Sequence, residues 1–139
     1  MTRGFTLLEL IIVIIIVTIL ATLGFMQYAA VIEKSRGAEA RSTIGILRSQ
    51  LIGKSYESGY GKISAESLGI VAGSIPPTCA STNYFSYTID PNCSVESCTF
   101  TATRCTIRGK EPQGADANTL QLIHDNASGT DTWLSTAGY

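Results

Sequence analysis

The sequence has little charge, and its two signs are almost balanced. Only 15% of the 139 residues are charged, with 10 Lys and Arg against 11 Asp and Glu and a net charge of −1. A dedicated nucleic-acid binder would show a basic excess, so no specific nucleic-acid partner is predicted. A hydrophobic content of 45% is too high for a disordered chain, and the length suits one ordinary domain.

The residue types that build catalytic and metal sites are also scarce. His124 is the only histidine, and no cysteine or second histidine lies near it at ligand spacing. The four cysteines form no CxxC unit, which disfavours a zinc site. The sequence therefore predicts no metal, no cofactor and no enzymatic activity, and it places His124 at the surface or at a strand end.

Charge is nearly missing from a long apolar segment near the N-terminus. Residues 5–25 contain a single charged side chain, that of Glu9. The run from Leu7 to Phe25 can cross a hydrocarbon core of about 30 Å at about 1.5 Å per residue. Arg3 is the only positive residue before it, which predicts a cytoplasmic N-terminus and an outside C-terminus. A cleaved secretory signal, with small residues such as Ala21 at its end, is the alternative.

A helical pattern continues beyond the apolar segment. No proline interrupts the chain before Pro76. Apolar or small residues recur at the three-four spacing of a helix face, at Gly37, Ala40, Ile44, Leu47 and Leu51. We therefore predict one helix from Phe5 to about Gly53. Its first part (5–28) belongs in a membrane or an assembly, and its second part (29–53) is amphipathic. A helix this long needs lipid or other subunits around its first half.

The remainder (54–139) is predicted to be a globular head. A Gly- and Ser-rich loop, with a helical turn at 65–68, runs to Pro77. Alternating aromatic and β-branched residues then predict strands at 84–89, 98–105 and 119–124, with a short final segment around Trp133. Short connections favour an antiparallel meander packed on the second half of the helix. The expected fold class is α+β.

Four cysteines allow three disulfide pairings. Cys98 and Cys105 would lie about 23 Å apart on one strand, which excludes a bond between them. If Ile89 faces Cys98 across the hairpin, Cys79 approaches Cys105 while Cys93 and Cys98 flank the turn. We favour these two bonds, and the pairing of Cys79 with Cys98 and Cys93 with Cys105 stays open.

Glu9 needs a partner, because a carboxylate in a transmembrane run costs several kcal/mol unless it is protonated or paired. No Lys, Arg or His lies within the same apolar stretch. A partner from a neighbouring chain would fix a stagger between subunits. A head-to-tail contact that does not close produces a helical filament.

The segment Gly4-Phe5-Thr6-Leu7-Leu8-Glu9 follows a short leader containing Arg3, and it resembles the class III signal of type IV pilins and pseudopilins. The resemblance is strong over residues 1–51. It implies the pilin fold, a leader (1–4) removed after Gly4 by prepilin peptidase, and N-methylation of Phe5. It also implies that Glu9 pairs with the Phe5 amine of an adjacent subunit.

The same resemblance implies a structural role, as the subunit of a homo-oligomeric helical type IV pilus that serves adhesion, motility or DNA uptake. The implied partners are prepilin peptidase, the platform protein and the assembly ATPase. The precursor would wait in the inner membrane before it joins the extracellular pilus. The alternatives are a minor pilin or a pseudopilin of a type II secretion system, for which Asp125 and Asp131 could form a calcium loop.

Overall fold

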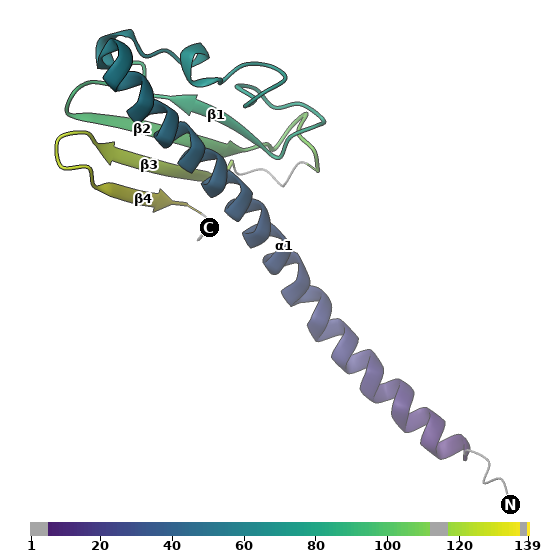
Figure 1. The fold of residues 1–139 in the computed structure, drawn as a ribbon. Helices are drawn as coiled ribbons and strands as arrows, with labels where there is room; N and C mark the ends of the chain where they lie inside the picture. Colours follow the sequence, from purple (N-terminus) through teal and green to yellow (C-terminus); the bar gives the residue numbers. More distant parts are fainter. Residues whose placement is uncertain (1–5, 112–116, 137–138) are drawn as a thin grey trace, which may run out of the picture. The chain divides into compact units, whose positions relative to one another are not determined.

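The computed structural model describes residues 6–111, 117–136 and 139. Its first element is a single helix, α1 (Leu7–Ser58), which is drawn from purple to teal in Figure 1. The chain forms two compact units, Met1–Ser35 and Arg36–Tyr139, so α1 contributes to both. Each unit is described here by itself.

The first unit consists of the apolar half of α1. Its large side chains are all solvent-exposed in the single chain, from Leu7 through the Ile and Val run to Phe25. None of the most apolar window of α1 is buried, and α1 is the one described helix that is long and apolar enough to cross a membrane. This half of the helix therefore has no internal core to hide its apolar surface, and a different environment must cover it.

The second unit buries one stripe of α1 against a sheet. Ala40, Ile44, Leu47 and Leu51 are fully buried, as their three-four spacing predicts. They share the core with aromatic and aliphatic side chains from the strands: Phe85, Tyr87, Phe100, Leu120 and Leu122. Each buried side chain of this size contributes about 1.5 to 3 kcal/mol, so this core carries the stability of the head.

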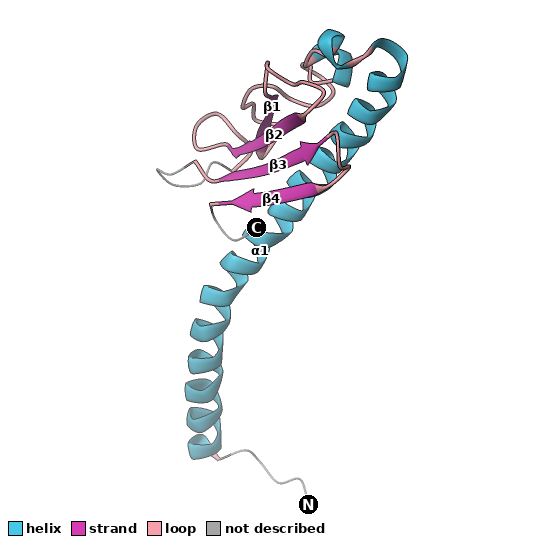
Figure 2. Ribbon diagram, turned by 90° about the vertical axis from the view of Figure 1, so that its left-hand side faces the viewer, coloured by secondary structure: helices cyan, strands magenta, loops and turns pink. Residues whose placement is uncertain are grey.

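Four strands form an antiparallel meander in the order β1-β2-β3-β4. They are β1 (Phe85–Ile89), β2 (Ser97–Arg104), β3 (Thr119–Asp125) and β4 (Asp131–Ser135). Figure 2 shows the sheet lying along the second half of α1. Buried and less buried residues alternate strictly along β2 and β3, because one face of the sheet meets the helix. The α+β layout predicted from the sequence is confirmed.

Two details differ from the sequence prediction. The helix continues past Gly53 to Ser58, because one glycine costs a helix interior only about 1 kcal/mol. Across the hairpin, Ile89 pairs with Phe100 and not with Cys98. The reason lies in the β1–β2 loop, where Asp90 Oδ1 accepts from the Asn92 backbone N–H at 2.8 Å and an Asx turn lengthens the connection.

The loop between α1 and β1 contains two short 3-10 helices, η1 (Tyr60–Lys62) and η2 (Glu66–Leu68). The second matches the helical turn expected near Leu68. Gly69 ends it in the left-handed conformation, with φ of 74°, which favours glycine. Leu68 and Ile70 are buried, so the loop closes one side of the core.

Candidate functional site

The first turn of α1 is closed by a reciprocal pair of hydrogen bonds between Thr6 and Glu9. The backbone N–H and the hydroxyl of Thr6 both donate to Glu9 Oε2 at 2.9 Å. In return, the Glu9 backbone N–H donates to Thr6 Oγ1 at 3.2 Å. This arrangement is a capping box, which satisfies backbone N–H groups that a helix start leaves unpaired.

The capping box gives Glu9 a local partner that the sequence analysis did not anticipate. The signal was present, because Thr-x-x-Glu before an apolar run is the pattern of a capping box. These partners are uncharged, so the Glu9 carboxylate has no counter-charge among the residues that the structure describes. Glu9 is the only charged residue of residues 6–32. The expected processing residues Gly4 and Phe5 lie outside the described part of the chain.

Two disulfides fasten the head, and they join the pairs that the spacing favours. Cys79 bonds to Cys105 with a Cα–Cα distance of 5.7 Å, and Cys93 bonds to Cys98 at 4.6 Å. The first links the loop before β1 to the end of β2. The second closes the β1–β2 loop.

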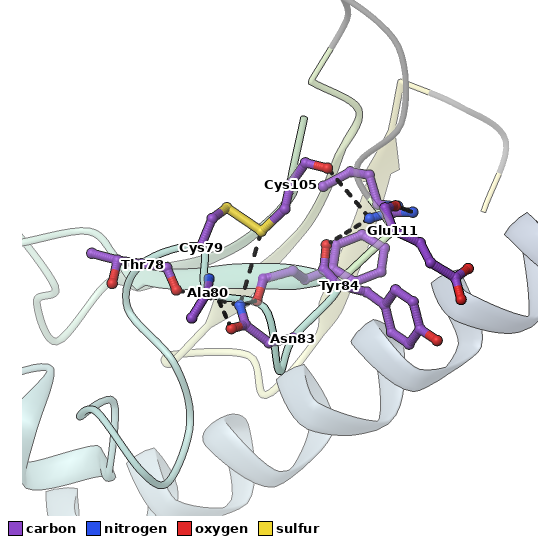
Figure 3. Close-up of a disulfide and its surroundings, with 9 residues drawn as sticks. Thr78, Cys79, Ala80, Asn83, Tyr84, Cys105 and Glu111 are labelled. Carbon is purple, nitrogen blue, oxygen red and sulfur yellow. Dashed lines mark hydrogen bonds between the residues drawn. A yellow bond between two sulfur atoms is a disulfide. The ribbon is translucent and has the colours of Figure 1, made fainter. Parts of the chain in front are cut away.

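Figure 3 shows how Asn83 organises the surroundings of the Cys79–Cys105 bond. Its amide donates to the backbone carbonyls of Phe85 at 2.7 Å and Thr78 at 3.3 Å. Its Oδ1 accepts from the Ala80 N–H at 3.0 Å. One side chain thus pairs two backbone groups of the loop before β1 and one of β1 itself, and this holds Cys79 within reach of Cys105.

Arginines from the second half of α1 reach the rest of the head. Arg36 pairs with Glu111, and its guanidinium lies 4.7 Å from the centre of the Tyr84 ring. Arg41 lies 5.0 Å from the Trp133 ring and donates to the Tyr139 carbonyl at 2.6 Å. These contacts attach α1 to late parts of the chain.

A third arginine, Arg48, forms a polar cluster with His124 and Asp131, of which His124 alone is buried. Arg48 Nε donates to Asp131 Oδ1 at 2.8 Å, and His124 Nδ1 lies 2.7 Å from the same oxygen. His124 is 3% exposed. It does sit near the end of β3, as expected, but it is buried rather than at the surface. The cause is Asp131 on β4, directly opposite His124 in the sheet register, which lets the imidazole be buried with a polar partner.

The two carboxylates considered for calcium are both occupied within the head. Asp131 accepts from Arg48 and contacts His124. Asp125 Oδ1 accepts the backbone N–H groups of Ser128 at 2.8 Å and Ala127 at 2.9 Å in the β3–β4 turn. The Ser128 hydrogen bonds, more than the Ala127 bond, lower the pKa of Asp125. Over residues 6–111, 117–136 and 139, no group of three or more His, Cys, Asp or Glu is placed to hold a metal ion.

Tyr87 is the other titratable side chain whose surroundings clearly matter. Its ring is buried beneath α1, and this burial raises the pKa of its phenol. The nearby Glu39 carboxylate raises that pKa further, and a hydrogen bond with Thr43 opposes both effects. Tyr87 therefore stays neutral at physiological pH and belongs to the core.

Comparison with protein families gives one match. Residues 1–25 match the prokaryotic N-terminal methylation motif. That motif is the class III signal of type IV pilins and pseudopilins, so the family resemblance of this segment is confirmed. No curated protein matches the chain. The motif indicates a structural subunit rather than an enzyme, and with the apolar helix it fits a membrane-anchored precursor.

Proposed function

We propose that this chain, which begins with the class III signal of type IV pilins and pseudopilins, is the structural subunit of a type IV pilus. The observation that carries the proposal is the first half of α1. It is apolar, exposed in the single chain, and charged only at Glu9. Such a surface has two stable environments, the membrane and a bundle of identical helices, and a pilus subunit moves from the first to the second.

Processing makes that transfer possible in this proposal. Prepilin peptidase cuts between Gly4 and Phe5, which precede the first helical residue, Leu7. The cut leaves a free amine on Phe5, next to the capping residue Thr6, and this amine is methylated in a separate step. In the bundle this amine pairs with Glu9 of an adjacent subunit. Because each subunit then offers one carboxylate and one amine at different heights, the contact repeats without closing.

The head contributes the outer surface of the proposed pilus. Its core is closed by α1, and each disulfide adds roughly 2 to 4 kcal/mol of stability to a small domain. Bonds of this kind persist outside the cell, where thiols are oxidised. The platform protein and the assembly ATPase would insert and withdraw subunits at the inner membrane. Adhesion, motility and DNA uptake are the roles such a pilus would serve.

The test is to identify the chain in filaments sheared from the producing cells, by intact mass and N-terminal sequencing. The proposal expects a chain that starts at methylated Phe5 and carries two disulfides. Its abundance separates a main subunit from a minor pilin. Absence from sheared filaments, with the chain still in the membrane and starting at Met1, would exclude the pilus role. A processed chain found only with a secretion apparatus would favour the pseudopilin alternative.

A further inference from the structure

The head contains a hollow that the proposed function leaves unused. It measures about 400 Å³, and its lining includes Arg48, Tyr56, Tyr60, His124, Asn126 and Gly129. Figures 1 and 2 both place the β3–β4 turn beside the later turns of α1, and these segments supply the lining. We refer to it as the Tyr56 hollow.

Arg48 brings fixed hydrogen-bond donors to the Tyr56 hollow. Its Nε is taken by Asp131 at 2.8 Å, which holds the guanidinium in place. The two terminal nitrogens form no hydrogen bond within the described part of the chain, so they are available to a ligand. Because Asp131 neutralises the charge of Arg48, the pair presents oriented hydrogen-bond donors without a net charge. An ionic ligand would gain little there.

His124 and Asn126 add polar groups to the lining of the Tyr56 hollow. In the tautomer whose Nδ1–H donates to Asp131, the Nε2 of His124 is an acceptor. Asn126 Nδ2 donates to the Ser94 carbonyl at 2.6 Å. Within the described part of the chain Asn126 Oδ1 has no hydrogen-bond partner, but this oxygen is shielded from solvent and is not an open acceptor in the hollow.

Tyr56 and Tyr60 add aromatic surface. The Tyr56 side chain is 87% exposed although it lies on a helix beside a structured head. Tyr60 in η1 is partly buried against the core and lines the same hollow. Each ring offers an apolar face and a hydroxyl at its edge, a combination suited to a ligand that is itself apolar on one side and polar at its rim.

We propose that the Tyr56 hollow binds the pyranose ring of a neutral sugar. A pyranose stacks its C–H face on an aromatic ring, and its hydroxyls both donate and accept, which matches the donors of Arg48, the imidazole of His124 and the hydroxyls of Tyr56 and Tyr60. The absence of net charge selects a neutral sugar over an acidic one. The carbonyls at the end of α1 also disfavour an anion there. The volume falls within the usual range for small-ligand sites.

The test uses the full-length chain in a detergent without a sugar headgroup, so that it does not depend on filament assembly. Saturation-transfer NMR would be recorded with glucose, galactose and N-acetylglucosamine, each as the free sugar and as the methyl glycoside, and with glucuronate. The methyl glycosides mimic the end of a glycan, so comparing the two forms separates a glycan source from a free sugar. The variant is Tyr56→Ala, and the control is Tyr28→Ala, which removes an exposed tyrosine from the same helix outside the hollow.

We expect transfer to at least one neutral sugar, about fivefold weaker binding in Tyr56→Ala, and unchanged binding in Tyr28→Ala. No transfer to any neutral sugar, transfer to glucuronate alone, or equal binding by wild type and Tyr56→Ala would each overturn the proposal. These outcomes leave the pilus role untouched, because no step in the experiment requires a filament.

Discussion

Replacing Glu9 in two ways separates its local role from its proposed role between subunits. Glutamine keeps the size and the acceptor oxygen of the side chain, so Glu9→Gln preserves the capping box with Thr6, whereas Glu9→Ala removes it. Neither variant carries the charge. The pair therefore isolates the electrostatic contribution of Glu9, with helix capping held constant in one variant.

The expected sizes of the two effects are different. Loss of the cap costs about 0.5 to 2 kcal/mol and acts on the first turn alone. Loss of one partner from a buried ion pair costs about 3 to 5 kcal/mol per contact, because the remaining charge stays unpaired in apolar surroundings. In the proposed pilus, Glu9→Gln leaves the Phe5 amine unpaired at every subunit. Such a free-energy cost lowers the equilibrium constant for each subunit contact by more than about a hundredfold.

We therefore expect both Glu9 variants to abolish filaments. The assay is the amount of subunit in the sheared fraction, with total cell content as reference. Intact mass shows whether the leader has been removed, so that a processing defect is not mistaken for an assembly defect. Thr6→Ala, which removes the capping hydroxyl and keeps the charge, is the control and should retain most of the filament yield. Wild-type assembly by Glu9→Gln, with failure of Glu9→Ala, would show that Glu9 acts only as a cap and would refute the pairing argument.

Three further predictions concern the head and are tested by unfolding the full chain in detergent. A Cβ added at Gly37 would overlap the Tyr139 ring, whereas one at Gly45 meets nothing within 4 Å. Gly37→Ala should therefore lower the free energy of unfolding by about 1 to 3 kcal/mol, and Gly45→Ala should raise it by up to about 1 kcal/mol. Equal melting temperatures for the two variants would contradict the packing of Tyr139 on Gly37. Replacing both members of a disulfide by serine should cost about 3.5 kcal/mol for Cys79–Cys105 and about 2 kcal/mol for Cys93–Cys98, because their separations are 26 and 5 residues. The reverse order in denaturant titrations would argue against loop closure as the cause. The pKa of Asp125 is lowered in the folded state, so its stabilising effect is present above the unfolded value of about 3.9 and is lost as pH falls through the folded value. The pKa of Tyr87 is raised, so its effect is complete below about 10 and is lost as pH rises toward the folded value. Asp125→Asn should reduce the acid loss and Tyr87→Phe the alkaline loss, and unchanged pH profiles would contradict these assignments.

The features that the sequence predicts correctly depend on near neighbours in the chain. The buried stripe from Ala40 to Leu51 is visible because helical spacing repeats every three or four residues. The alternation along β2 and β3 is visible because a strand repeats every two. The N-terminal signal occupies consecutive residues, so it too can be identified without a structure.

The features that escape prediction depend on residues far apart. His124 looks like a surface residue because its partner Arg48 lies 76 positions earlier, and the pairing with Asp131 requires the strand register. The partners of Arg36 and Arg41 are equally hidden in the sequence, because they lie 75 and 98 positions later. The hairpin register differs by two positions because the Asx turn at Asp90 adds length that propensity alone does not show. Only the Thr6 capping box was local and overlooked.

The attachments of α1 also determine when the head can close. The hydrogen bonds from Arg36, Arg48 and Arg41 reach partners 75, 83 and 98 positions later in the chain. The ribosome makes the helix first, but the residues that hold it are made last. In the proposed inner-membrane precursor, the apolar stripe of Ile44 and Leu47 remains open until those residues have crossed the membrane. Such a subunit would be anchored long before it is folded, and its head would complete folding only after export, which would keep unfinished heads out of any assembly that requires a closed surface.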